Sequence, residues 1–256
     1  MVAARMGFSK QMPLSLCAKI VFIGAMFAFG IPIVRAQSGH DAVLLKQHSA
    51  MVGDVDVLVG DNGFSMSFRK MNLFITMQAP LWHITYCNTS RKIYYSCTPK
   101  QMKANPAVFS AMFRPSSPTS LRSSTSEKTI YKGLPCTKFR LVSQEAVAKA
   151  SDKTWKRLMP KDGTSWVLAR THFPHEAYRL ASNLMALPVS EGIPVAFTFQ
   201  RYDNEVLHEL ALFGFEKKKL KGKEFDPPPG FALVTDQNKV FGKGVEEKDF
   251  AEFLKE

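Results

Sequence analysis

The chain has 256 residues and a formal net charge of +12 at pH 7, and its length suits one domain with a sizeable core. Basic residues are not interleaved with stacking aromatic residues, so we expect no nucleic acid partner. The sequence contains no Gly-x-Ser-x-Gly elbow, phosphate-binding glycine loop, His-Glu-x-x-His or Cys-x-x-Cys motif. We therefore expect a binding protein that is not an enzyme and needs no metal or cofactor.

Residues 1–36 have the layout of a secretory signal peptide. Basic residues up to Lys19 precede an apolar run over residues 20–34, and Val34 and Ala36 stand at positions −3 and −1 of a cleavage site. The apolar run is shorter than the roughly 20 residues of a spanning helix, which disfavours the alternative of an uncleaved anchor. We expect cleavage after Ala36 and a periplasmic or secreted chain over residues 37–256. Removal of four basic residues and no acidic one lowers the net charge from +12 to +8.

The first part of this mature chain predicts one helix and then strands. Residues 41–52 predict a short helix with Asp41 near its cap. Apolar and polar residues then alternate with period two on both sides of the Gly-Asp-Asn-Gly turn at residues 60–63, which predicts a hairpin with one buried face. The strands expected here cover residues 55–59, 64–68, 73–77, 81–87 and 92–97.

The second part begins with a less regular stretch. Residues 99–113 are weakly helical, residues 114–128 predict an exposed, mobile Ser/Thr/Pro-rich loop, and residues 144–159 lean towards helix. The clearest helix covers residues 174–187, with Pro174 in its first turn and Pro188 at its end. Its apolar stripe comprises Ala177, Leu180, Ala181 and Leu184. The later strands are expected at residues 129–142, 166–169, 195–199, 206–219 and 231–235.

Successive antiparallel strands with few helices predict an α+β domain, in which a curved, unclosed antiparallel β-sheet (a half-barrel) is capped by helices. A concave face that carries Phe and Met, and that the helices do not quite seal, forms an apolar cavity. The side chains that we expect to line it are Met66, Phe68, Ile75, Phe197, Phe199 and Phe213.

The order of sequence landmarks resembles a known superfamily. The landmarks are Ala79-Pro80-x-Trp82, Tyr131-Lys132-Gly133-Leu134, Gly192-Ile193-Pro194 and Phe225-Asp226-x-Pro228-Pro229-Gly230-Phe231. Together they are similar to the periplasmic LolA/LolB-like lipoprotein carriers and their LppX-type and RseB-type relatives. The resemblance implies a half-barrel sheet capped by helices, with a cavity for acyl chains. It also implies that the partner is an acyl chain, a lipid or a lipoprotein.

Two functions of other classes stay open. The chain could be a secreted protein-interaction or envelope-stress sensor module with a dry core and a basic surface. It could also be an unrecognised hydrolase, for which His83, His172 and His175 would be the residues to test. The pair His172 and His175 does not predict a metal site, because a proline separates the two and further ligands are lacking.

A run of lysines is the densest charge cluster in the sequence. It suits contact with anionic lipid headgroups or with an acidic envelope protein. The alternative is the solvated end of a strand, where lysines discourage edge pairing. The run comprises Lys217, Lys218, Lys219, Lys221 and Lys223.

Three cysteines follow the predicted cleavage site. If residues 88–91 form a turn, Cys87 stands opposite Lys92 and Cys97 opposite Trp82, too far apart for a disulfide. Cys97 ends its strand, and Cys136 lies near the start of the next long strand. This arrangement predicts a Cys97–Cys136 disulfide with Cys87 free, and the alternative is three reduced, buried thiols.

Overall fold

The computed structural model describes residues 40–104, 121–143, 160–169, 173–189 and 191–241. The chain divides into two units, Met1–Ala36 and Gln37–Glu256, and every described residue belongs to the second unit. The predicted signal peptide therefore lies outside the described residues. The same holds for residues 144–159 and for the first part of the predicted Ser/Thr/Pro-rich loop.

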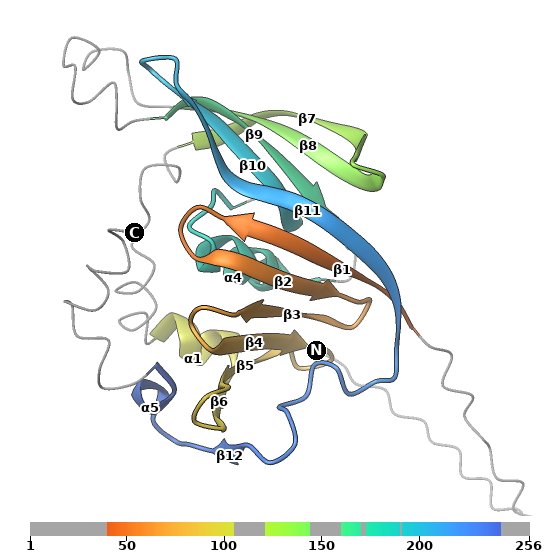
Figure 1. The fold of residues 1–256 in the computed structure, drawn as a ribbon, viewed down its shortest axis with the longest axis vertical. Helices are drawn as coiled ribbons and strands as arrows, with labels where there is room; N and C mark the ends of the chain where they lie inside the picture. The colour runs from red at the N-terminus through yellow and green to blue at the C-terminus, as the bar shows by residue number, and fades with distance from the viewer. Residues whose placement is uncertain (1–39, 105–120, 144–159, 170–172, 190, 242–256) are drawn as a thin grey trace, which may run out of the picture. The chain divides into compact units, whose positions relative to one another are not determined.

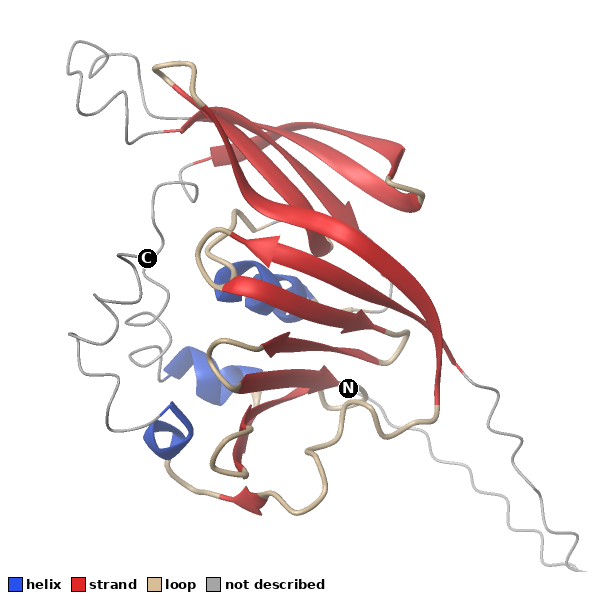
Figure 2. Cartoon of the chain, viewed as in Figure 1, coloured by secondary structure: helices blue, strands red, loops and turns tan. Residues whose placement is uncertain are grey.

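Strands dominate the described residues (Figure 2). Their bounds are β1 (His40–Ser49), β2 (Gly53–Val59), β3 (Gly63–Phe68), β4 (Leu73–Gln78), β5 (His83–Asn88), β6 (Ile93–Cys97), β7 (Leu121–Tyr131), β8 (Leu134–Ser143), β9 (Pro160–Leu168), β10 (Ile193–Arg201), β11 (Val206–Leu220) and β12 (Ala232–Leu233). They form one 12-stranded sheet in the order β12-β6-β5-β4-β3-β2-β1-β11-β10-β9-β8-β7 (Figure 1). Among the described strands only β12 and β6 pair in parallel, and the order has two ends. The prediction of a large, unclosed and mainly antiparallel sheet is confirmed.

The two halves of the sheet meet in its middle. The chain runs outward from β1 to β6 through tight turns, resumes at the opposite edge with β7, and returns through β8, β9 and β10 to β11. β11 then pairs with β1 from Leu220 opposite His40 to Leu210 opposite Ser49. Residues about 170 positions apart in the sequence are therefore hydrogen-bonded neighbours.

One face of the sheet carries the core, and we call it the inner face. In β2, β3 and β4 the residues of the predicted alternation lie in register, as in the row Val57, Met66 and Ile75. All three are buried, so the predicted hairpin is confirmed. Three short helices account for the described helical residues: α1 (Pro99–Ala104), α4 (His175–Leu184) and α5 (Gln237–Phe241). The residue pair before α4 and the end of α5 bring aromatic rings to this face: the ring centroid of Phe173 lies 6.1 Å from that of Phe64, and the ring centroid of Phe241 lies 5.6 Å from that of Tyr86.

The helix predicted over residues 174–187 is confirmed as α4. It follows Pro174, and its predicted stripe of Ala177, Leu180, Ala181 and Leu184 is buried. The helix expected at residues 41–52 is wrong, because His40–Ser49 is strand β1. Both edges of β1 are hydrogen-bonded, to β2 and to β11, and this pairing outweighs a weak local helical preference.

The prediction of a loop over residues 114–128 is also wrong for residues 121–128, which belong to a strand. Leu121–Tyr131 forms β7, which pairs with β8 from Leu121 opposite Ser143 to Tyr131 opposite Leu134. Serine and threonine made this segment resemble a loop. Its strand state depends on β8, which supplies the backbone partners.

After β11 the chain passes around the β6 edge of the sheet. Residues 221–231, which we call the C-terminal strap, cross the outer face, where Phe225 is buried with Ala42 and Leu220 and the partly buried Leu58 packs against them. β12 then pairs with β6, and α5 lies on the inner side, where Asn88 Nδ2 donates a hydrogen bond to the Val240 carbonyl at 2.8 Å. The Pro-Pro-Gly landmark at residues 228–230 therefore belongs to a segment that contacts both faces of the sheet near β6.

β10 and β11 pair over only part of their length. Their ladder runs from Gln200 opposite Val206 to Phe197 opposite Leu210 and stops there. Beyond it β11 continues along β1, and β10 is paired with β9 alone. We call this divergence the β10–β11 seam, formed by residues 193–196 and 211–214. Side chains bind carbonyl groups of both strands here: Gln47 those of β10, and Lys132 Nζ the Leu212 oxygen at 2.6 Å.

Candidate functional site

The inner face is the strongest candidate for a binding site. Five of the six predicted lining residues belong to one continuous core cluster and are at most 4% exposed. They are Met66, Phe68, Ile75, Phe197 and Phe199. The structure thus brings together residues of β3 and β4 with residues of β10, which are distant from them in the sequence. That they line a ligand cavity stays a prediction.

Phe213 is not part of this core, and its prediction as a lining residue is wrong. Its side chain is 70% exposed, and its ring centroid lies 6.0 Å from that of His48. The register of β1 and β11 shifts here, since Lys46 faces Gly214 and Gln47 faces Leu212. The extra residue of this bulge is Phe213, so the period-two alternation that predicted its direction does not hold across it.

Methionines lie at the boundary of the inner core. Met51, Met71 and Met102 are partly buried and pack against it, while Met66 and Met77 lie fully inside. Unbranched thioether side chains adapt to irregular apolar shapes at low cost. The boundary can therefore repack more easily than the β-branched centre of the face.

A cluster of aromatic side chains packs at the start of α4. The ring centroid of Phe173 lies 5.1 Å from that of Trp82 in an edge-on arrangement, and 6.1 Å from those of Phe64 and Tyr178. Trp82 belongs to the turn between β4 and β5, so the group joins helix and sheet. Aromatic pairs of this kind contribute about 0.5–1.5 kcal/mol each beyond their buried area.

Among the buried polar side chains of the inner layer are Gln47 of β1 and Ser182 of α4. Gln47 is 2% exposed and donates from Nε2 to the Pro194 and Val195 carbonyls at 2.8 and 2.9 Å. Ser182 of α4 is fully buried. No sequence signal marked either residue, because Gln47 occupied a segment expected to be helical and Ser182 interrupts no pattern.

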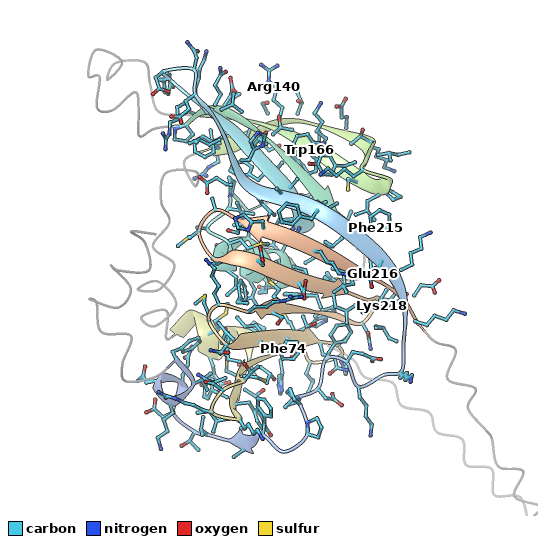
Figure 3. The ribbon with its side chains drawn as sticks, in the orientation of Figure 1. Phe74, Arg140, Trp166, Phe215, Glu216 and Lys218 are labelled. Atoms are coloured by element: carbon cyan, nitrogen blue, oxygen red, sulfur yellow. The ribbon has the colours of Figure 1, made fainter. Side chains whose placement is uncertain are left out.

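The lysine run is exposed, but it does not form one patch on β11. Lys217 and Lys219 leave the strand on one face and Lys218 on the other, because side chains alternate along a strand. Lys218 Nζ lies 3.9 Å from Glu216 Oε2, and Figure 3 labels these two residues near the end of β11. The remaining two lysines follow in the C-terminal strap. Contact of all five with one anionic surface stays a prediction.

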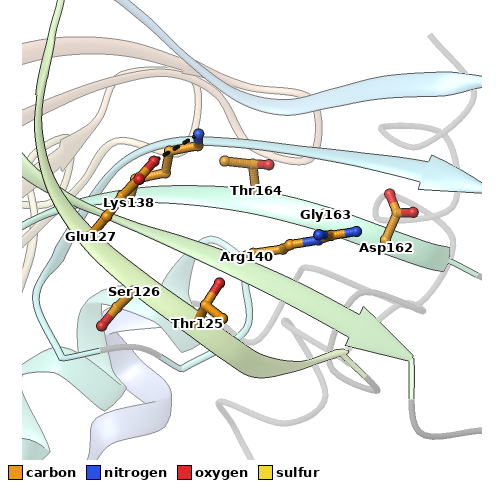
Figure 4. Close-up of a pocket in the computed structure, with 8 residues that line it drawn as sticks. All are labelled: Thr125, Ser126, Glu127, Lys138, Arg140, Asp162, Gly163 and Thr164. Carbon is orange, nitrogen blue, oxygen red and sulfur yellow. Dashed lines mark hydrogen bonds and ion pairs between the residues drawn. The ribbon is translucent and has the colours of Figure 1, made fainter.

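A polar pocket of about 370 Å³ lies on β7, β8 and β9 (Figure 4). Lys138 Nζ and Glu127 Oε1 form an ion pair of 3.0 Å at one end of it. Arg140 and Asp162 line the other end, so two cationic and two anionic side chains balance. These groups can hydrogen-bond a polar ligand, and the described part of the lining holds no histidine or cysteine.

A second groove, of about 390 Å³, lies on the outer face beside the C-terminal strap. Thr76, Thr85 and Ser96 stand opposite one another on β4, β5 and β6 and form a row of hydroxyls, with Thr85 Oγ1 3.2 Å from Ser96 Oγ. His83 and Asp226 also line the groove. No hydrogen bond between described residues joins His83 to Ser96 or to Asp226, so a nucleophile–base–carboxylate chain is not assembled there.

The predicted disulfide is wrong. Cys87, Cys97 and Cys136 are buried and reduced. Cys97 lies on β6 and Cys136 on β8, and eight strands separate these two in the sheet order. The hairpin register also differs from the expected one, since Cys87 faces Tyr94 and Cys97 faces Ile84.

Burial makes these thiols poor nucleophiles. It raises the pKa of Cys87 to about 12 and the pKa values of Cys97 and Cys136 to about 11. At neutral pH all three are therefore protonated, and only the thiolate is reactive.

Of the three histidines considered for hydrolase or metal chemistry, two lie in the described part of the chain. His83 and His175 are exposed, and His172 lies outside the described residues. Within the described residues no group of three or more His, Cys, Asp and Glu side chains could hold a metal ion. Among the described helices, none has both the length and the apolar character to cross a membrane.

Comparisons with known proteins give only weak similarities. No family model and no curated protein sequence matches the chain. An uncharacterized conserved protein from Thermus thermophilus is similar with a TM-score of 0.30 and 9% identity, over 75% of this chain and 89% of that chain. A domain from Vibrio parahaemolyticus, provisionally described as an outer membrane lipoprotein-sorting protein domain, is similar with a TM-score of 0.23 and 8% identity, over 80% and 90% of the two chains. TM-scores this low do not define a fold family, so the LolA/LolB-like assignment stays a prediction.

Proposed function

We propose that this chain is an exported, non-enzymatic protein that binds the acyl chain of a lipid or lipoprotein, or another apolar ligand. The ligand would lie between the inner face of the sheet and the helices that pack on it. The observation that carries the proposal is the inner face itself. Every inward position of β2, β3 and β4 is apolar and buried, and the sheet to which they belong is open at β12 and at β7.

The energy of such binding comes from apolar burial. Each methylene removed from water contributes about 0.8 kcal/mol, so about ten of them contribute about 8 kcal/mol. Association costs about 4 kcal/mol or more for lost translation and rotation. An acyl chain alone therefore supports moderate affinity, which suits a protein that takes up a ligand and releases it again.

Entry of a ligand requires a helix to move, because the inward side chains are fully buried. α4 has ten residues and is held largely by apolar contacts, with the Phe173 ring against Trp82 and Phe64. Contacts with an acyl chain would replace those that α4 loses. The partly buried methionines at the core boundary would adapt to the new shape.

The proposed place of action is the periplasm or the exterior of the cell, after cleavage behind Ala36. In either place the mature chain would meet anionic lipid headgroups or acidic envelope proteins. The exposed lysines at the end of β11 and in the C-terminal strap are the proposed contacts for such surfaces.

Mass spectrometry tests the proposal. The protein would be purified without detergent from the compartment to which its host exports it, and extracted with organic solvent. We expect lipid or fatty acid in a near-stoichiometric amount, and displacement of a fluorescent fatty-acid analogue by the extracted material. If the protein carries no lipid and binds no analogue, its core holds no ligand, and the basic surface would be the candidate for the functional site.

A further inference from the structure

Gln47 places an amide in the middle of the apolar inner layer. It belongs to β1, the central strand, and its inward neighbours across the strand are Val55 and Leu212. All three residues are buried. A glutamine with 2% exposure is unusual at such a position unless its polar atoms have hydrogen-bond partners.

The orientation of this amide is set by the β10–β11 seam. β10 does not pair with β11 at residues 193–196, and Gln47 Nε2 donates both of its hydrogens there, to the Pro194 and Val195 carbonyls. The reverse orientation would place Oε1 against two carbonyl oxygens, neither of which can donate. The Gln47 oxygen is therefore held in one direction.

That oxygen accepts no hydrogen bond from the described residues. A buried acceptor without a donor costs about 1–3 kcal/mol, so such a position favours a ligand or a water molecule that donates. An apolar side chain at position 47 would not carry this cost, but it would also lack the two hydrogen bonds to the Pro194 and Val195 carbonyls.

α4 adds a second polar atom to the same layer. The Ser182 hydroxyl is fully buried and makes no hydrogen bond with the described residues. Its helix packs on the inner face through Leu180 and Leu184. Sheet and helix therefore each contribute one polar atom without a hydrogen-bond partner among the described residues to a mainly apolar layer.

We propose that Gln47 is the polar recognition point of the ligand site. The ligand would be an amphiphile that carries a hydroxyl or amide N–H donor on or next to its apolar chain, such as a 3-hydroxyacyl chain. Gln47 Oε1 can only accept, so it selects a donor and disfavours a buried carboxylate at that point. This inference rests on the proposed function and adds the chemical class of the ligand.

Two matched probes test it on protein expressed from the full sequence. Tetradecanoate and 3-hydroxytetradecanoate have the same chain length and differ in one hydroxyl. Each would displace a fluorescent fatty-acid analogue in a titration. We expect the hydroxylated probe to bind about tenfold more tightly, the factor that one well-placed hydrogen bond supplies.

The variant Gln47→Met keeps the side-chain length and removes the acceptor. We expect it to bind the two probes with equal affinity. Ser182→Ala keeps Gln47 and should retain a preference for the hydroxylated probe; its melting curve and that of Gln47→Met would be compared with the parent. If Gln47→Met does not fold, the titrations of the parent protein still test the proposal. Equal affinity of the parent for the two probes would show that Gln47 is not a recognition point. Binding of both probes without preference would leave the proposed function standing, whereas binding of neither would overturn both.

Discussion

The ring of Phe225 lies against Gly63 at the start of β3. A Cβ atom on Gly63 would come within 3.1 Å of Phe225 Cδ2 and within 2.6 Å of the Met77 carbonyl oxygen. The position is thus filled from two directions, by the C-terminal strap and by β4. Glycine here allows the strap to lie flat on the outer face of the sheet.

We therefore expect Gly63→Ala to lower the free energy of unfolding by about 1–3 kcal/mol, the usual cost of overpacking. Urea denaturation followed by circular dichroism would measure it. Gly214→Ala is the matched control, because Gly214 is also in a strand and a Cβ there would meet nothing within 4 Å. Equal effects of the two substitutions would show that the strap does not press on Gly63.

Two phenylalanines test the assignment of the inner face. Phe199 is buried and Phe213 is 70% exposed. Phe199→Ala should destabilise the protein by about 3–5 kcal/mol because it leaves a cavity, and Phe213→Ala should change stability by less than about 0.5 kcal/mol. Denaturant midpoints of both variants would be compared with the parent. A large loss for Phe213→Ala would contradict the bulge in β11.

The buried thiols give a prediction about reactivity. Native protein at pH 8 should react slowly with iodoacetamide at Cys87, Cys97 and Cys136, and all three should react rapidly in guanidinium chloride. Peptide mapping without reduction should find no bond among them. Fast labelling of the native state would show that these side chains are not buried.

The same thiols contribute to the dependence of stability on pH. Their pKa values are raised to about 11 or 12 in the folded state, above the ordinary thiol value near 8.5. Between these values the unfolded chain has lost thiol protons that the folded chain keeps, so stability falls as pH rises. We expect this decline to begin near pH 9. Replacement of Cys87 by Ala should make the decline shallower, and an unchanged slope would contradict the contribution of Cys87.

The lysines at the end of β11 test the surface contact. Association with anionic vesicles should weaken steeply with added salt, because exposed charges are screened over about 8 Å at physiological ionic strength. Lys217→Gln with Lys219→Gln should weaken it more than Lys218→Gln does, since Glu216 already lies near Lys218. Vesicle sedimentation would measure the difference. Binding that none of these changes alters would mark the lysines as solvated surface only.

Local patterns predicted a good part of the fold. The alternation around residues 60–63 identified the β2–β3 hairpin, and the apolar stripe after Pro174 identified α4. Both depend on neighbours within a few positions along the chain. The same information failed at residues 41–52, where β1 is a strand because β11 and β2 pair with it on either side.

The sequence by itself determined that an open, mainly antiparallel sheet has one apolar face, because period-two alternation is a local property of each strand. The pairing of strands that are distant in the sequence decided the register, the strand order and the position of the polar atoms. The bulge opposite Lys46 and Gln47 turned Phe213 outward, and the strand order placed eight strands between the strands of Cys97 and Cys136, which the sequence had suggested were neighbours. The seam that orients Gln47 exists only because β11 follows β1 where β10 leaves it. No local pattern carries that information, since the register of strands distant in sequence depends on the packing of the whole sheet.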